Sequence, residues 1–205
     1  MFLVRPCQLY YDNKVVKKTT VKVAITGGVA CGKSTAGKIL EDMGFPIEDS
    51  DRIARELFDH DESCRKEILH TLGSLDRNQI RDLVFSNPQK KKILEEILHP
   101  RIRAEYLQWM HRQLEKNPRY IFVMIPLLFE SSGQKYFDKV LCIDCDTQTQ
   151  LTRLTQRPGI DDVLAKKIIQ SQLPKEEKAR LSDWVVDASH GIPEMKQSLE
   201  KIFGN

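Results

Sequence analysis

Residues 21–43 read VKVAITGGVACGKSTAGKILEDM, and this stretch decides the fold. Its first six residues are rich in β-branched side chains, as in a buried strand, and the residues after Lys33 have the composition of a helix. Between them, the segment from Gly27 to Ser34 fits G-x-x-x-x-G-K-[ST] at every fixed position. A strand, this loop and a helix together form a Walker A phosphate loop.

Each fixed residue of the loop has a physical task. Gly27, Gly28 and Gly32 can adopt backbone angles closed to other residues, so successive N–H groups can face a phosphate. The helix that follows adds the positive end of its dipole. Lys33 is expected to reach the β- and γ-phosphates, and the Ser34 hydroxyl to ligate Mg²⁺. The predicted ATP-binding residues are Gly28, Val29, Ala30, Cys31, Gly32, Lys33, Ser34 and Thr35, with Ser34 as the metal ligand.

Composition restricts the function. A chain of 205 residues is long enough for one domain, and 40% hydrophobic with 30% charged residues is typical of a soluble globular protein. The net charge of the chain is +3, of which residues 1–22 carry +4, so the remaining residues carry −1. This distribution argues against a nucleic-acid-binding protein. No apolar run approaches the ~20 residues of a membrane span. The five cysteines favour a reducing compartment, so we expect a cytoplasmic protein.

Strands that alternate with helices predict an α/β fold, a doubly wound parallel sheet of five strands of the P-loop NTPase type. Ligands of such sheets lie beyond the carboxyl ends of the strands, so Asp49 and Asp51, after the second strand, should face the phosphate site. Cys142 and Cys145 should point to opposite faces of their strand, which argues against a shared metal or redox site. The expected strands are 21–26, 45–49, 120–125, 139–144 and 184–186.

The helical segments divide the chain. Residues 1–20 are an N-terminal arm with no assigned function, and residues 21–205 are one phosphate-loop kinase domain. Residues 51–117 should form a helical insertion that binds an acceptor, with a helix interruption or a new helix at Pro100. Residues 147–181 should form a lid whose arginines close over ATP; a solvated helical pair is the alternative. The core of the domain comprises residues 21–50, 118–146 and 182–205.

A phosphate loop does not by itself choose a reaction. The sequence has no N-K-x-D motif, and no D-x-x-G follows the third strand, which argues against a GTPase. The short chain, the early helical insertion and the arginines of the lid favour a kinase of the nucleoside-monophosphate-kinase type. Another small-molecule kinase, for a nucleoside or a nucleoside monophosphate, and an ATP-binding regulator without turnover are the alternatives.

Five motifs, taken in order, resemble those of dephospho-CoA kinases. Thr26-Gly27-Gly28 through Gly32-Lys33-Ser34-Thr35 is similar to the T-G-G-x-x-x-G-K-S-T of that family, and Asp49-Ser50-Asp51 with Ile53-Ala54-Arg55 is similar to its D-A-D-x-I-A-R. The further matches are Leu75-Asp76-Arg77, His99-Pro100-Arg101-Ile102 and Pro126-Leu127-Leu128-Phe129-Glu130. The resemblance extends from about Val21 to the C-terminus.

The resemblance implies transfer of the ATP γ-phosphoryl group to the ribose 3′-hydroxyl of dephospho-CoA, with Mg²⁺. A sugar hydroxyl is a poor nucleophile, so Asp51 is the expected general base, while Lys33, Arg153 and Arg157 should stabilise phosphoryl charge. The alternatives are an acidic helix cap for the aspartates and a structural role for His99. The implied acceptor-binding residues are Thr26, Asp49, Asp51, Arg77, His99, Arg103 and Glu130.

The resemblance also sets the expected partners. They are the small molecules ATP and dephospho-CoA, with no nucleic acid and no membrane, and the chain should be a monomer or a weak homo-oligomer. Met124 stands where many members have Asp, so no Walker B carboxylate is evident and the Mg²⁺ ligands beyond Ser34 stay open. Residues 181–191, expected near the adenine, also depart from the family pattern.

Overall fold

The computed structural model describes residues 19–204, so most of the expected arm, residues 1–18, lies outside the described residues. Within that range five strands form one parallel sheet in the order β2-β3-β1-β4-β5. This confirms the predicted doubly wound sheet. The strands are β1 (Val21–Gly27), β2 (Ile47–Asp49), β3 (Tyr120–Met124), β4 (Lys139–Asp144) and β5 (Trp184–Asp187).

The strand β1 lies at the centre of the sheet because it pairs along both edges. Ile25 lies opposite Met124 of β3 on one side and Leu141 of β4 on the other. Ala24 and Ile25, which point to opposite faces of the sheet, are both fully buried, as expected for a strand covered on both faces. All five carboxyl ends therefore meet at one edge, where the phosphate loop follows β1.

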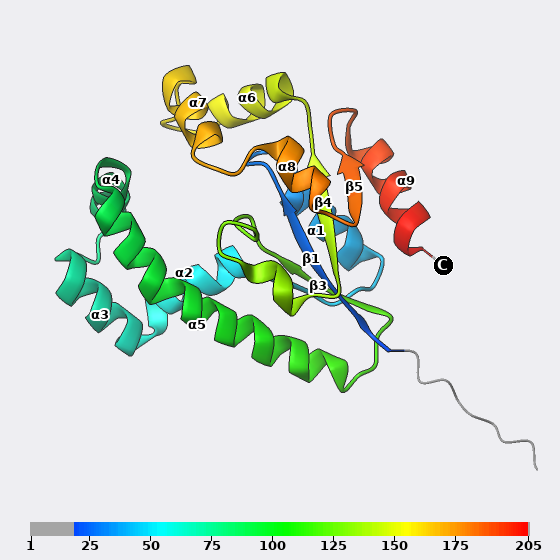
Figure 1. Cartoon of the computed structure of the whole chain (residues 1–205), viewed down its shortest axis with the longest axis horizontal. Coiled ribbons are helices and arrows are strands. Elements are labelled where there is room, and N and C mark those ends of the chain that lie inside the picture. Colours follow the sequence, from blue (N-terminus) through cyan, green and yellow to red (C-terminus); the bar gives the residue numbers. More distant parts are fainter. Residues whose placement is uncertain (1–18, 205) are drawn as a thin grey trace, which may run out of the picture.

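Two layers of helices cover the sheet (Figure 1). On one face, α1 (Lys33–Asp42) packs against α9 (Ile192–Phe203), and their apolar residues share a core with Phe122. The other face is covered by α8 (Lys175–Arg180), which contacts β1 and β4, and by α5 (Pro88–Leu114), which contacts β3. The central strands are thus shielded from water on both sides.

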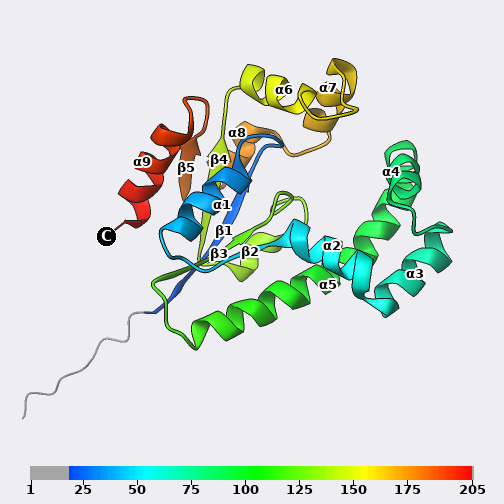
Figure 2. The same ribbon diagram turned by 180° about the vertical axis from the view of Figure 1, so that it is seen from behind.

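The expected insertion after β2 is helical (Figure 2). Each helix begins at a side-chain cap: Asp49, Asp61, Asp76 and Asn87 each accept a hydrogen bond from a backbone N–H of the first turn. α2, α3 and α4 all pack against the long helix α5. The insertion comprises α2 (Ser50–His60), α3 (Glu62–Leu72), α4 (Arg77–Ser86) and α5.

The structure corrects one expectation for this insertion. α5 runs without a break from Pro88 to Leu114, with Pro100 inside it, where we predicted an interruption or a new helix. Proline removes the hydrogen bond to the carbonyl four residues earlier, which belongs to Glu96. Glu96 is exposed, so water can satisfy that carbonyl. The packing of Ile97 and Tyr106 in the core then holds both halves of the helix in line.

The expected lid is also helical. α6 (Thr147–Thr155) and α7 (Asp162–Gln170) are separated at Gly159, which adopts a φ of 77°, and α8 follows. In both views α6 and α7 lie beyond the carboxyl ends of β1 and β4 (Figures 1 and 2). The segment between β3 and β4 contains a short 3₁₀ helix, η1 (Gly133–Tyr136).

We expect the aromatic cluster between the sheet and α9 to be a main source of stability. Phe203 is 1% exposed, and its ring meets those of Phe122 and Trp184 edge to face at centroid distances of 5.1 and 5.2 Å. Phe203→Ala should lower the free energy of unfolding by about 3–5 kcal/mol in urea titrations. The control Phe85→Ala, at a ring that is 62% exposed, should change it by less than about 0.5 kcal/mol. Equal effects would contradict this assignment.

Candidate active site

The phosphate loop has the backbone geometry that its glycines predict. Gly27 has a φ of 146°, and a Cβ there would lie 2.0 Å from the carbonyl oxygen of Ile143 in β4. Gly32 has a φ of 96° and directly precedes α1. Both positions therefore require glycine, one through close approach of two backbones and the other through its left-handed conformation.

Lys33 lies at the start of α1 with its ammonium group inside the loop. Its Nζ donates to the carbonyl oxygens of Gly27 at 3.1 Å and Gly28 at 2.8 Å. Burial lowers the pKa of Lys33, while Cys31 in its thiolate form and the Asp51 carboxylate oppose that shift through their negative charges. The loop thus holds a largely desolvated cation where a phosphate would bind.

A cavity of about 640 Å³ opens above this loop. Arg153 of α6 and Arg157, just after it, border the cavity opposite the loop, and Arg153 donates to the carbonyl oxygen of Ala188 at 2.8 Å. The expected catalytic cations therefore gather around one space. Its lining includes Val29, Ala30, Gly32, Lys33, Ser34, Thr35, Asp51, Ala188, Gly191, Ile192 and Met195.

The two predicted carboxylates differ in role. Asp49 caps α2, because its Oδ1 accepts a hydrogen bond of 2.9 Å from the Asp51 N–H. The Asp51 carboxyl is exposed to the cavity, yet burial by the surrounding protein and the nearby Asp49 charge raise its pKa, against the attraction of Lys33 and Arg55. Asp51 is therefore a carboxylate whose proton affinity is increased beside the phosphate loop.

A second, smaller cavity of about 100 Å³ lies between α5 and the segment after β3. It is lined by Asp51, His99 and Arg103, with Pro126 and Leu127 on the opposite wall. Burial and the Arg103 charge lower the pKa of His99, although Glu95 opposes the shift. Three of the predicted acceptor residues thus share one cavity.

Other predicted acceptor residues lie elsewhere. Arg77 pairs with Asp59 at 2.8 Å on the outer part of the insertion and covers the ring of Phe58, away from both cavities. Thr26 is buried, and its hydroxyl donates to the Pro126 carbonyl oxygen at 3.3 Å. The Glu130 carboxylate pairs with Lys178 at 2.9 Å.

The Cys31 side chain is buried beneath the loop. Its Sγ lies 3.0 Å from Sγ of Cys145, just beyond β4. The hydrogen bond donated by the Cys145 thiol lowers the pKa of Cys31, and the same contact raises the pKa of Cys145. Cys142, three residues before Cys145 in the sequence, lies within β4, and burial raises its pKa to about 12.

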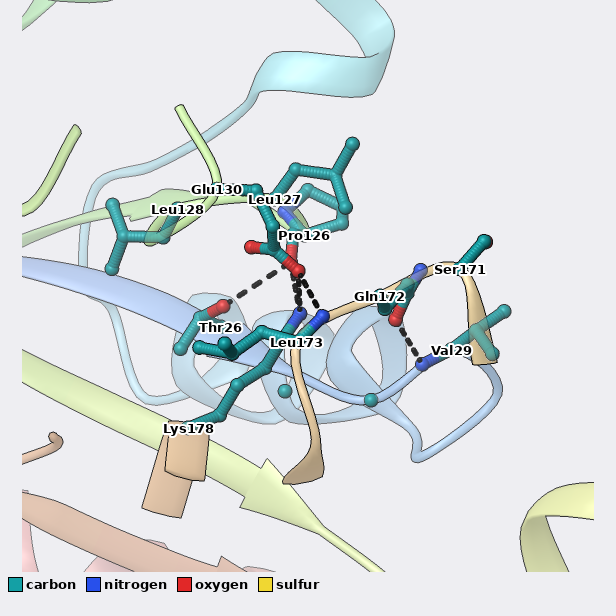
Figure 3. Close-up of polar contacts among 12 residues, drawn as sticks. Thr26, Val29, Pro126, Leu127, Leu128, Glu130, Ser171, Gln172, Leu173 and Lys178 are labelled. Carbon is teal, nitrogen blue, oxygen red and sulfur yellow. Dashed lines mark hydrogen bonds and ion pairs between the residues drawn. The ribbon is translucent and has the colours of Figure 1, made fainter. Parts of the chain in front are cut away.

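Sequence reasoning missed three side chains near the loop, of which Gln172 and Lys178 are drawn in Figure 3. Gln172, which follows α7, accepts a hydrogen bond from the Val29 N–H at 3.1 Å, and Gln150 of α6 donates to the Val29 carbonyl oxygen at 2.9 Å. The third is Lys178 of α8, which is fully buried. The contacts of Gln172 and Gln150 with Val29, and the burial of Lys178, have no counterpart in sequence spacing.

The donors around the larger cavity suit Mg²⁺. Ser34 and Asp51 both line it, and Mg²⁺ prefers a few protein oxygens together with water and phosphate oxygens. Among residues 19–204 no group of three histidine, cysteine or acidic side chains converges as a metal cage. The two oxygen donors of Ser34 and Asp51 fit an Mg²⁺ ion whose other ligands are water and phosphate oxygens.

A phosphate loop at the edge of a parallel sheet, an arginine-bearing helical segment above it and a carboxylate beside it define a phosphate-loop kinase. The comparisons with known proteins specify which kind. The chain belongs to the dephospho-CoA kinase family, whose model matches residues 21–194.

Individual relatives agree with this assignment. The chain is 34% identical over 188 residues to the dephospho-CoA kinase of Fusobacterium nucleatum, an alignment that covers 88% of this chain and 95% of that protein. The structure of dephospho-CoA kinase from Campylobacter jejuni is 31% identical with a TM-score of 0.67 and covers 89% and 95% of the two chains. For TT1252 from Thermus thermophilus the identity is 26%, the TM-score 0.76 and the coverage 90% and 97%.

The raised pKa of Asp51 predicts a stability effect. A folded-state pKa above the unfolded value means that stability is lost as pH rises through the interval between the two values. Asp51→Asn should therefore raise the free energy of unfolding at pH 7. The gain should shrink on acidification and vanish below about pH 3.9, the usual carboxyl pKa. Urea titrations at a series of pH values measure this difference.

A suitable control for that prediction is Asp162→Asn. Asp162 is exposed in the first turn of α7, where a negative charge interacts favourably with the helix dipole. Its replacement should lower stability at pH 7 by about 0.3–1 kcal/mol, the opposite sign. A destabilised Asp51→Asn variant at neutral pH would contradict the assigned cause.

Proposed function

We propose that the chain transfers the γ-phosphoryl group of ATP to the ribose 3′-hydroxyl of dephospho-CoA, giving CoA and ADP. One observation carries the proposal: Asp51 lines both the cavity above the phosphate loop and the cavity beside α5. A single carboxylate thus lies between a nucleotide site and a second substrate site. Membership of the dephospho-CoA kinase family supports the identity of the acceptor.

In this proposal Asp51 acts as the general base. It accepts the proton of the acceptor hydroxyl as the oxygen attacks the γ-phosphorus, and ADP leaves with the electron pair of the broken P–O bond. The increased proton affinity of Asp51 suits this role, because a base with a very low pKa would hold a proton poorly. Asp49 acts indirectly, since its cap fixes the start of α2 and with it Asp51.

The cations act on phosphoryl charge. The Lys33 ammonium, the loop N–H groups and the N-terminus of α1 hold the triphosphate, and Arg153 and Arg157 stabilise the transferred group from the lid, residues 147–181. Ser34, with Asp51 nearby, would hold Mg²⁺, which supplies further positive charge to the β- and γ-phosphates. Ala188, Gly191 and Met195 border the same cavity and provide the surface for the adenine.

The insertion, residues 51–117, is the proposed acceptor-binding part. His99 and Arg103 lie one turn apart on α5 and border the cavity at Asp51. The lowered pKa of His99 favours its neutral form, which can accept a hydrogen bond, whereas Arg103 supplies a fixed positive charge. Arg77, farther along the insertion, is proposed to contact a more distant part of this long acceptor.

We further propose a cytoplasmic enzyme, monomeric or weakly homo-oligomeric, whose partners are these two small molecules and neither nucleic acid nor membrane. The four cysteines of the described residues are free thiols, which suits a reducing compartment. In the part of the chain that the structure describes, no helix is both long and apolar enough to span a bilayer.

Acceptor-dependent ADP formation tests the proposed function. With Mg-ATP, purified protein should form ADP rapidly with dephospho-CoA and little with AMP, uridine, pantothenate or shikimate. Asp51→Asn should bind ATP normally in calorimetry but lose most turnover, because the hydroxyl proton has no acceptor. Preference for AMP or uridine would indicate another kinase, and no acceptor dependence would indicate a regulator. Full activity of Asp51→Asn would remove that residue from the base role.

Arg157 tests the lid. Its side chain is exposed at the cavity, so Arg157→Ala should lower kcat by about 10³-fold or more while the free energy of unfolding changes little. The exposed lid residue Lys166 provides a control, because Lys166→Ala removes a charge of the same sign outside the cavity lining. An Arg157→Ala variant that fails to fold would instead favour a structural role.

A further inference from the structure

Lys178 is the most unusual charged residue near the site. It lies in α8, is 0% exposed and is the one buried lysine among the described residues. Its Nζ donates to the Pro126 carbonyl oxygen at 3.0 Å and lies 2.9 Å from Oε1 of Glu130 (Figure 3). A buried ammonium is costly unless it is paired and hydrogen-bonded, and both conditions are met here.

Glu130 extends this contact to the end of the lid. The same Oε1 atom accepts a hydrogen bond of 3.0 Å from the N–H of Leu173. The preceding residue, Gln172, accepts the Val29 N–H at 3.1 Å, within the phosphate loop. A continuous set of contacts therefore runs from α8 through the segment after β3 to the loop, and all of its members are visible in Figure 3.

Pro126 connects Lys178 to both cavities. Its carbonyl oxygen accepts hydrogen bonds from Lys178 Nζ and, at 3.3 Å, from the Thr26 hydroxyl, the last strand residue before Gly27. Pro126 itself lines the larger cavity and the smaller one. A displaced Lys178 would therefore shift the wall that separates the two proposed substrate sites.

We propose that Lys178 is a positioning residue for phosphoryl transfer: through Glu130 and Gln172 it fixes Val29 of the phosphate loop, and through Pro126 it fixes the wall shared by the two cavities. We call this set, Lys178, Glu130, Gln172, Val29 and Pro126, the lid relay. Lys178 itself lines neither cavity, so it acts through the groups it holds. The proposal rests on the proposed function for its kinetic readout.

The geometry favours positioning over a contribution to stability alone. A buried ion pair gives little net stability compared with apolar side chains of the same size, because desolvation offsets the attraction. The pair instead fixes the relative positions of several segments. Lys178 contacts Pro126 and Glu130, which follow β3, and Glu130 contacts Leu173 of the lid. Misplacement of reacting groups by about 1 Å can lower a rate by about 10²-fold.

The test compares Lys178→Met, Gln172→Leu and the double variant with wild type, at a temperature where circular dichroism shows each to be folded. Lys178→Met keeps an unbranched side chain one atom shorter and removes the charge and the donors. Each single variant should lower kcat by about 10-fold to 10²-fold, with KM for ATP and dephospho-CoA within about 3-fold. The kcat of the double variant should be no lower than that of the less active single variant, because the effects of substitutions within one relay do not add.

Hydrogen exchange gives a readout that does not depend on the acceptor. Lys178→Met should speed amide exchange in a peptide that covers Val29, although Lys178 does not touch that residue. The control is Lys175→Met on the same helix, where Nζ donates to the Cys145 carbonyl oxygen at 2.9 Å outside the relay. That variant should leave kcat within about twofold of wild type.

The outcomes separate the two proposals. Unchanged kcat and unchanged exchange in Lys178→Met would overturn the lid relay, as would kcat losses that multiply in the double variant. If Lys178→Met does not fold, Gln172→Leu decides, because Gln172 is partly exposed; unchanged kcat and unchanged exchange at Val29 in that variant would overturn the lid relay. A wild-type protein without transfer to dephospho-CoA would overturn the proposed function, whereas the exchange result would still decide the relay.

Discussion

The site depends on one constraint, the parallel pairing of β1 with β3 and β4. Because the three strands are parallel and Ile25 lies opposite both Met124 and Leu141, their carboxyl ends lie at one edge and the segments that follow them face the same space. A slip by one residue would exchange the two faces of a strand and so disturb the packing of both helical layers against the sheet. The close approach of Gly27 to the Ile143 carbonyl oxygen leaves no room for a side chain at the start of the loop. Core packing therefore determines where the phosphate loop and its carboxylate meet.

Much of this architecture could be predicted because local rules govern it. Buried parallel strands appear as apolar runs, and the loop between β1 and α1 is defined by residues with particular backbone requirements. The place of Asp51 followed from the rule that ligands lie beyond strand ends. His99 and Arg103 were expected at the acceptor site from the family resemblance, and the structure places both at the cavity beside Asp51. These predictions needed no knowledge of distant contacts.

The relay, the thiol contact and the course of α5 could not be predicted in this way. Gln172 and Val29 are 143 residues apart, and Cys31 and Cys145 are 114 apart, so both contacts arise from the packing of elements that are remote in sequence. Lys178 lies in the segment KEEKAR, which has the composition of a solvated helix, and only the position of α8 across β1 and β4 buries it. At Pro100 a local rule failed, because packing on both sides kept the helix continuous.

The electrostatics of the site follow from the same packing. Burial lowers the pKa of Lys33 and raises that of Asp51, so in both residues the protein disfavours the charged form that the proposed mechanism requires. The carbonyl oxygens of Gly27 and Gly28 offset part of this cost for Lys33, but they carry only partial charges. A triphosphate supplies full negative charge at the same place, so it is a stronger partner for the ammonium than the loop itself. In the proposed function a bound triphosphate would offset the cost of burying the Lys33 ammonium, whereas its negative charge would raise the proton affinity of Asp51 further.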